Sequence, residues 1–252
     1  MYTDNSYGLE KVQGELLRIL SVFHNYCRTN KVDYSVYAGT MLGAIREHGF
    51  IPWDDDVDIV MTMDNYSKLL ELTMNDPDYY IDLEDAWVPR FRSRREDHGP
   101  FVDLFVFADE PRGIAKTITV FRLRTLQGML KKYNSVKKIS LGYKMLLGGT
   151  KLIGKLFPRK YLLERYWKIG YGKKRVSDTL YVPTAGFRWV KDVAFKKEKI
   201  EAGYTDICFE NIKIEIFKEY DYMLVVQFGN DYMIPVKESE RVGFHQSQIQ
   251  KS

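Results

Sequence analysis

Cysteine is nearly missing from this chain of 252 residues, which contains only Cys27 and Cys208. The two residues lie far apart and in no metal-ligand or redox spacing, so we expect free thiols in a reducing cytoplasm. No run of about 18 apolar residues occurs, which excludes a membrane-spanning helix. The opening residues, MYTDNSYGLEK, lack the apolar core that a secretory signal needs, and no such signal is expected.

Acidic residues are scarce in one long segment. Residues 113–177 contain 17 Lys or Arg and one acid, Glu164, which gives this segment a charge of +16 and leaves −12 on the rest of the chain. Such charge separation favours an anionic partner. Apolar residues interleave with the bases, which suits an interfacial helix on the anionic inner face of a membrane. The alternative is a helical subdomain with a solvated basic face. Nucleic acid is not expected, because RNP, KH and zinc motifs are absent.

Apolar spacing predicts both helices and strands. Residues 9–27 have the spacing of an amphipathic helix. Strand-like runs follow at 33–38, 57–61, 101–107 and 212–217. These patterns predict an α+β fold with a mixed sheet core and helices, plus the basic segment as a mainly helical part.

The densest charge is the stretch Asp54-Asp55-Asp56-Val57-Asp58, with four carboxylates in five residues. In an extended segment Asp54, Asp56 and Asp58 point to one face, because side chains alternate along a strand. Oxygen ligands that converge in this way suit a hard divalent cation, with Mg²⁺ as first choice and Mn²⁺ as second. A solvated acidic loop that binds nothing is the alternative.

Two further features would complete a metal-dependent nucleotide site. Gly39-Thr40, after Tyr37, ends a strand where a helix begins, so the glycine and the free N–H groups of the helix N-terminus would cradle a phosphate. Asp103 lies between apolar residues in a strand pattern, where an unpaired buried acid would be costly. Beside a metal it would be a third ligand or the base that takes a hydroxyl proton. Alone it would be an edge residue facing water.

Arginines alternate on the strand-like run before Asp103. Arg90, Arg92 and Arg94 fall on one face of that run. Such a guanidinium row either clamps a diphosphate or protects a solvated strand edge with charge. The spacing leaves both interpretations open.

Two stretches together resemble the LicD family. Residues 37–46 (YAGTMLGAIR) and 49–59 (GFIPWDDDVDI) are similar to its GTLLGAxRH and GFIPWDDDxD patterns. Residues 101–105 resemble its IDIFP element, although Val106 replaces the proline, and residues 228–235 resemble its C-terminal YGDxYMxxP element. Glu47 interrupts the family's Arg-His pair and Phe228 replaces a common tyrosine, which bears on donor choice. The resemblance covers residues 33–107 and, more weakly, about 207–245.

This resemblance implies a nucleotidyltransferase-like fold and transfer of a phosphorylated alcohol, such as phosphocholine or ribitol phosphate, from a CDP-linked donor to a glycan. It assigns Asp56, Asp58 and Asp103 as catalytic and metal-binding carboxylates, with Asp54 as a further candidate ligand and Mg²⁺ (or Mn²⁺) as the cofactor. The residues expected to bind the donor are Tyr37, Gly39, Thr40, Arg46, Arg92 and Arg94.

The resemblance also implies a division of the chain. We expect residues 1–112 to form a nucleotidyltransferase-like core, 113–177 a basic insertion, and 178–252 a part that completes the catalytic domain. The expected partners are a CDP-alcohol, a glycan or lipid-linked sugar acceptor, and an anionic membrane surface. Competing hypotheses are a nucleotidyltransferase that uses an NTP on a small acceptor, and a non-catalytic membrane-surface module, whose mark would be the loss of one metal carboxylate.

Overall fold

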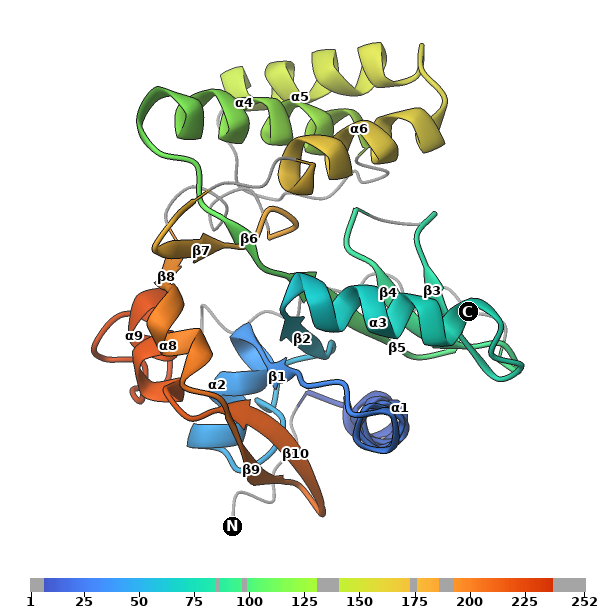
Figure 1. Ribbon diagram of the computed structural model, residues 1–252, viewed down its shortest axis with the longest axis vertical. Coiled ribbons are helices and arrows are strands. Elements are labelled where there is room, and N and C mark those ends of the chain that lie inside the picture. Colours follow the sequence, from blue (N-terminus) through green and yellow to red (C-terminus); the bar gives the residue numbers. More distant parts are fainter. Residues whose placement is uncertain are drawn as a thin grey trace.

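The computed structural model in Figure 1 describes residues 7–84, 87–96, 99–130, 141–172, 176–185 and 193–237. The elements of its first half are, in chain order, α1 (Glu10–Asn30), β1 (Ser35–Val36), α2 (Ala38–Arg46), β2 (Asp58–Met61), α3 (Met63–Met74), β3 (Tyr79–Asp82), β4 (Arg90–Ser93) and β5 (Phe101–Val106). Together with the elements that follow, they confirm the predicted α+β fold.

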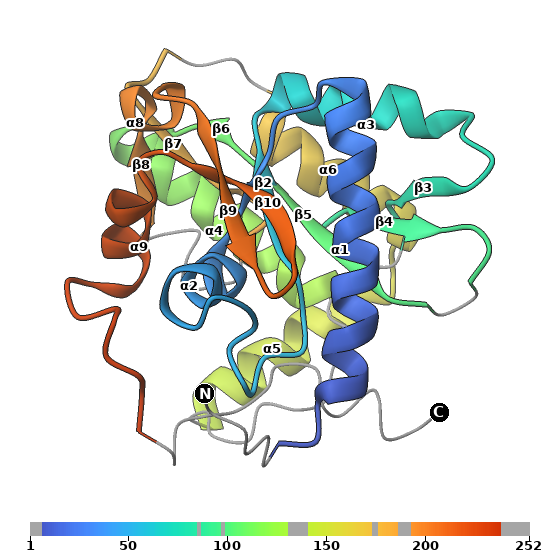
Figure 2. The ribbon, with the colours of Figure 1, turned by 90° about the horizontal axis from the view of Figure 1, so that it is seen from below.

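A five-stranded mixed sheet forms the core, in the order β1-β2-β5-β4-β3. Strands β2 and β5 run parallel, and the other neighbouring pairs run antiparallel. Helix α1 covers one face of this sheet (Figure 2), where the rings of Phe23 and Phe91 pack edge to face at 5.2 Å. Val102 is the register partner of Phe91 and points to the same face. Side chains of opposite parity on β5, including Asp103, therefore point to the face away from α1.

The C-terminal part of the chain returns to this core. It contributes β7 (Thr179–Tyr181), β8 (Ala194–Lys196), α8 (Lys197–Glu201), β9 (Tyr204–Phe209), β10 (Ile212–Phe217) and α9 (Tyr220–Phe228). Strand β6 (Ala108–Asp109) pairs with β7, and β9 and β10 form a hairpin. The Phe217 N–H donates to Ser35 Oγ at 3.1 Å, which joins the hairpin to β1. Phe209, Ile214 and Ile216 are fully buried in the same core as α1.

Helices α4 (Gly113–Leu130), α5 (Leu141–Gly154) and α6 (Arg159–Tyr171) form a layer at one end of the molecule (Figure 1). This layer has its own small apolar core, made of Val120, Leu123, Leu126, Leu130, Leu162, Leu163, Tyr166 and Tyr181. Stacking of Tyr66 on Trp167, with ring centroids 5.5 Å apart, connects α3 to α6. The prediction of a mainly helical basic segment is confirmed for its described residues, whereas the three-part domain division stays a prediction. None of the described helices combines the length and apolar composition needed to cross a membrane.

Candidate active site

Two of the predicted catalytic aspartates lie side by side on the parallel strands. Asp58 begins β2, Asp103 is the third residue of β5, and the two are register partners. The Asp103 N–H donates to the Val57 carbonyl at 2.9 Å, which fixes this register. Side chains at paired positions of parallel strands project to the same face. The parallel pairing therefore brings together two carboxylates that are 45 residues apart in the sequence.

The other three aspartates lie on the loop that leads into β2. Side-chain oxygens of Asp54, Asp55 and Asp56 lie within 4.8 Å of one another, and Asp55 is the buried member. Gln13 on α1 holds this loop, because its Nε2 donates to the Asp54 carbonyl at 2.9 Å. The loop is therefore anchored to the core of the fold and is not a freely solvated acidic turn. Asp55, which the sequence left without a role, belongs to this cluster.

Electrostatic repulsion is strong at the site. Burial, followed by the negative charge of Asp56 and a hydrogen bond to it, raises the pKa of Asp54 to about 8. Burial, followed by the charges of Asp56 and Asp103, raises the pKa of Asp58 well above its ordinary value. Carboxylates with raised pKa values in a shared site call for a positive counter-charge. Clustered carboxylate oxygens are the ligands that Mg²⁺ and Mn²⁺ prefer, so the donor set fits the predicted metal.

The start of helix α2 meets this cluster. A Cβ added to Gly39 would lie 2.6 Å from Asp54 Oδ2, so this position needs a glycine for the carboxylate to approach the helix N-terminus. Thr40 Oγ1 accepts a hydrogen bond from the Asp58 N–H at 2.9 Å, and Thr40 is buried. A helix N-terminus offers free N–H groups and a positive dipole end to anions. Gly39 and Thr40 are thus brought to the aspartates, and Thr40 also positions Asp58.

Tyr37 is buried next to the same carboxylates. Its ring packs against Phe105 with centroids 5.4 Å apart. Burial, followed by the charge of Asp58, raises the pKa of its hydroxyl. That hydroxyl has no hydrogen-bond partner within the part of the chain that the structure describes. Because buried hydroxyls are nearly always hydrogen-bonded, this unpartnered atom, which feels the charge of Asp58, is a candidate contact for a bound group.

The predicted arginine row divides between two locations. Arg90 Nε donates to Asp103 Oδ1 at 2.9 Å, and its guanidinium lies over the Phe101 ring. Arg92 Nε instead donates to Asp82 Oδ2 at 3.1 Å. Arg94 Nε donates to the carbonyl of Asp76 at 2.9 Å. The structure therefore brings Arg90 to Asp103 and gives Arg92 and Arg94 hydrogen-bond partners on the β3 side of the sheet. The Arg92 guanidinium also lies over the Phe101 ring, and the donor-binding role of Arg92 and Arg94 stays a prediction.

Arg46 also lies apart from the aspartates. It ends α2, about 12 Å along the helix axis from Ala38 by the rise per residue. Its Nε donates to Glu47 Oε1 at 2.7 Å, and Nη1 donates to the Tyr232 carbonyl at 3.3 Å. The predicted donor-binding arginine therefore ties α2 to the C-terminal segment in this structure. Glu47, the residue that interrupts the family pattern, is its partner.

Glu210 is a residue whose place sequence reasoning missed. It lies at the turn between β9 and β10, and its carboxylate accepts the Phe50 N–H at 3.0 Å. A Cβ at position 49 would collide with the same carboxylate, so a glycine is needed there while Glu210 keeps this position. Glu210 thereby ties the C-terminal hairpin to the loop that carries the aspartates. The available signal was the weaker resemblance over about residues 207–245, which includes Glu210.

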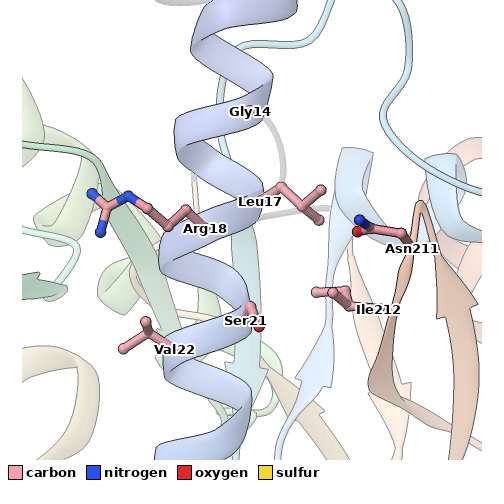
Figure 3. Close-up of a pocket in the computed structure, with 7 residues that line it drawn as sticks. All are labelled: Gly14, Leu17, Arg18, Ser21, Val22, Asn211 and Ile212. Atoms are coloured by element: carbon pink, nitrogen blue, oxygen red, sulfur yellow. The ribbon is translucent and has the colours of Figure 1, made fainter.

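A hollow among the described residues lies elsewhere, between α1 and the start of β10. Figure 3 shows Leu17 and Ile212 facing one another across it, and Arg18 is also part of its lining. Its volume is about 370 Å³. A smaller hollow of about 230 Å³ beside it reaches Gln13 and Glu210. None of the five aspartates lines either one, so we assign neither of them to the reaction.

A carboxylate cluster on a parallel strand pair, beside a glycine-containing helix start, defines a candidate metal-dependent transferase site. Residues 31–134 match the family described as LicD/FKTN/FKRP, nucleotidyltransferase domain. Residues 31–134 are therefore similar to the LicD-family domain, as the sequence resemblance predicted, and this segment includes all five aspartates.

Three relatives match parts of this chain. The lipopolysaccharide cholinephosphotransferase LicD of Haemophilus influenzae is 40% identical over 78 residues, which are 31% of this chain and 29% of that protein. Uncharacterized proteins of Rickettsia typhi and Rickettsia prowazekii are 40% and 41% identical over 50 and 44 residues. Those segments are 20% and 18% of this chain, and 16% of each relative. The chain thus aligns with less than a third of each relative.

Proposed function

We propose that this protein is a metal-dependent phosphotransferase. It would move a phosphorylated alcohol, phosphocholine or a polyol phosphate, from a CDP-linked donor to a sugar hydroxyl of a cell-surface glycan. The observation that carries the proposal is the five-aspartate cluster inside the segment that is similar to the LicD-family domain. The Haemophilus relative, named a lipopolysaccharide cholinephosphotransferase, supports the choice of a glycan acceptor.

The residues that would hold Mg²⁺ or Mn²⁺ are Asp56, Asp58 and Asp103, with Asp54 as an additional ligand. Carboxylate oxygens are the ligands that such an ion prefers, and the raised pKa values of Asp54 and Asp58 indicate that the cluster calls for a positive counter-charge. When bound, the ion neutralises charge on the donor diphosphate and on the departing phosphate. The Tyr37 hydroxyl, which has no hydrogen-bond partner among the described residues, would donate a hydrogen bond to a ligand held there.

The chain's own groups would orient the donor. The first N–H groups of α2 offer an anion site for the CMP phosphate beside Gly39. Thr40 holds the Asp58 backbone, and Arg90 holds the Asp103 carboxylate, so both acids keep their positions as charge builds up. Fixed donors and charges of this kind lower a barrier because they need no reorganisation during the reaction.

The transfer itself makes one oxygen–phosphorus bond and breaks another. The acceptor hydroxyl oxygen attacks the β-phosphorus, and the bond from that phosphorus to the bridging oxygen breaks, which releases CMP. Asp103 would take the hydroxyl proton, a role suited to a carboxylate beside the reacting oxygen. The products are the phosphodiester-linked glycan, CMP and one proton.

A panel of CDP-alcohols and NTPs tests this proposal. Each donor is incubated with the protein, Mg²⁺ and a glycan acceptor, and the products are identified by mass spectrometry. Release of CMP with transfer of the alcohol phosphate from one CDP-alcohol is the expected result. Release of pyrophosphate from an NTP would replace the proposal with the nucleotidyltransferase alternative.

A further inference from the structure

The helical layer exposes an unusual amount of apolar surface. Among the described residues, nine of the fourteen large hydrophobic side chains that face solvent belong to residues 113–177. These nine are Ile114, Ile118, Phe121, Leu152, Ile153, Leu156, Phe157, Tyr161 and Val176. Contiguous exposed apolar surface on a water-soluble fold usually marks a binding face.

Helix α4 carries apolar residues on two opposite faces. Val120 and Leu123 face the core of the helical layer. Ile114, Ile118 and Phe121 follow the i, i+4, i+7 spacing of one stripe on the opposite side, and Phe121 is 70% exposed. A helix that is apolar on both faces is normally covered on both. This stripe therefore calls for a partner beyond the helical layer.

The end of α5 and the start of α6 form a second apolar feature, the α5–α6 corner. It consists of Leu152, Ile153, Leu156, Phe157 and Tyr161. Leu156 is 78% exposed and Leu152 is 67% exposed, and the rings of Phe157 and Tyr161 stack with centroids 5.9 Å apart. Bases flank the corner, because Lys155 and Lys160 are also exposed. At a bilayer surface, protruding apolar side chains can enter the boundary of the acyl chains while neighbouring lysines remain among the headgroups.

The charge of the layer selects among possible partners. Residues 113–177 carry +16 with a single acid. Such a surface is attracted to anionic lipid headgroups, whose field extends about a Debye length from the membrane. A nucleic acid would bind the lysine and arginine side chains through its phosphates and would leave the leucines and phenylalanines in water. The combination of bases with exposed aliphatic and aromatic side chains fits lipid better.

We propose that the α4–α5–α6 layer docks on an anionic phospholipid membrane, with the α5–α6 corner and the α4 stripe entering the interface. The inference rests on the exposed residues of this layer and stands independently of the phosphotransferase proposal. It places the protein as a peripheral membrane-binding molecule. The opposite end of the molecule, which carries the β9–β10 hairpin, would point away from the lipid (Figure 1).

Vesicle flotation tests this proposal on the full chain. Phosphatidylcholine vesicles with and without phosphatidylglycerol are compared at low and high salt. We expect binding to the anionic vesicles alone, and weaker binding as salt rises. Lys155→Gln with Lys160→Gln should lower the partition coefficient by roughly 30-fold, and Leu156→Ser should lower it by roughly tenfold.

Matched control variants separate a specific surface from general charge and hydrophobicity. Lys213 is exposed on the hairpin and Met74 is 65% exposed at the end of α3, so Lys213→Gln and Met74→Ser should leave binding unchanged. Equal binding to neutral vesicles, no binding to anionic ones, or equal loss in the controls would overturn the proposal. A lipid-free dimer that Leu156→Ser dissociates would assign the corner to a second copy instead. Tight oligonucleotide binding that Leu156→Ser leaves unchanged, without vesicle binding, would assign the layer to nucleic acid.

Discussion

Asp58 and Asp103 are register partners on two parallel strands, and the Asp103 N–H donates to the carbonyl of the residue before Asp58. Their carboxylates consequently share one face of the sheet, opposite the face that α1 covers. Burial and the charges of Asp56 and Asp103 raise the pKa of Asp58. The fold therefore maintains charge repulsion at this point, which a bound cation would relieve.

Asp58→Asn should stabilise the metal-free protein while it removes activity. Loss of the buried charge relieves the repulsion that raises the pKa of Asp58, so the free energy of unfolding in EDTA should rise. Mg²⁺ should raise the melting temperature of the wild type and have little effect on the variant. Thermal melts with EDTA and with Mg²⁺ measure both effects. A variant that is less stable in EDTA and still stabilised by Mg²⁺ would argue against the site.

Gly39→Ala should displace the Asp54 carboxylate, since the added Cβ would lie 2.6 Å from Oδ2. We expect kcat to fall by roughly tenfold or more, because a shift of about 1 Å in the position of a catalytic-site group slows the reaction strongly. Gly14→Ala on α1 is the control, because a Cβ there meets no atom within 4 Å. That change should stabilise the helix by roughly 0.5–1 kcal/mol and leave kcat unchanged. Equal kcat values for the two variants would show that the position of the Asp54 carboxylate does not affect turnover.

Thr40 is predicted to act as a positioning residue through its hydrogen bond from the Asp58 N–H. Thr40→Val keeps the shape of the side chain and removes the acceptor, at a cost of roughly 1–3 kcal/mol in unfolding free energy. Turnover should fall with it, and the KM for the donor should change little. Thr40→Ser retains the hydroxyl and should restore kcat. A serine variant as slow as the valine variant would show that packing, and not the hydrogen bond, matters.

Arg90 and Arg92 are expected to differ in effect although they are two residues apart on one strand. Arg90→Lys breaks the geometry of the contact with Asp103 and should lower kcat. Arg92→Lys weakens the ion pair with Asp82 and should lower stability, leaving kcat and KM within about twofold of the wild type. Steady-state kinetics on both variants, with melting curves, checks this. A strong rise in donor KM for Arg92→Lys would restore the diphosphate clamp suggested by the strand spacing.

The sequence predicted much of the fold because its signals are local. Helix α1 follows from the spacing of Leu16, Ile19, Leu20 and Phe23, and strands β2 and β5 follow from apolar runs around single acids. The pairing of β10 with the N-terminal core carries no such local signal. Its contacts, such as Phe217 with Ser35, join residues more than 180 positions apart.

The candidate site divides in the same way. The clustering of the aspartates from Asp54 to Asp58, and the position of Gly39 close to them, could be predicted from spacing and resemblance. The choice of Arg90 over Arg92 could not, because only strand register decides which arginine lies beside Asp103. The partners of Arg46 could not be predicted for a similar reason, and its donor-binding role stays a prediction. The length of α2 separates it from the aspartates, and its partner Tyr232 is far away in the sequence.

Metal-dependent release of CMP is the most direct test of the central claim, that the aspartate cluster carries the transfer. The measurement compares wild type with Asp56→Ala, each with Mg²⁺ and with EDTA, on the CDP-alcohol that the donor panel selects. Circular dichroism confirms that both proteins are folded. The account predicts CMP from the wild type with Mg²⁺ alone, and a loss of at least about a hundredfold in the variant. Undiminished CMP release from folded Asp56→Ala, or from wild type in EDTA, would contradict it.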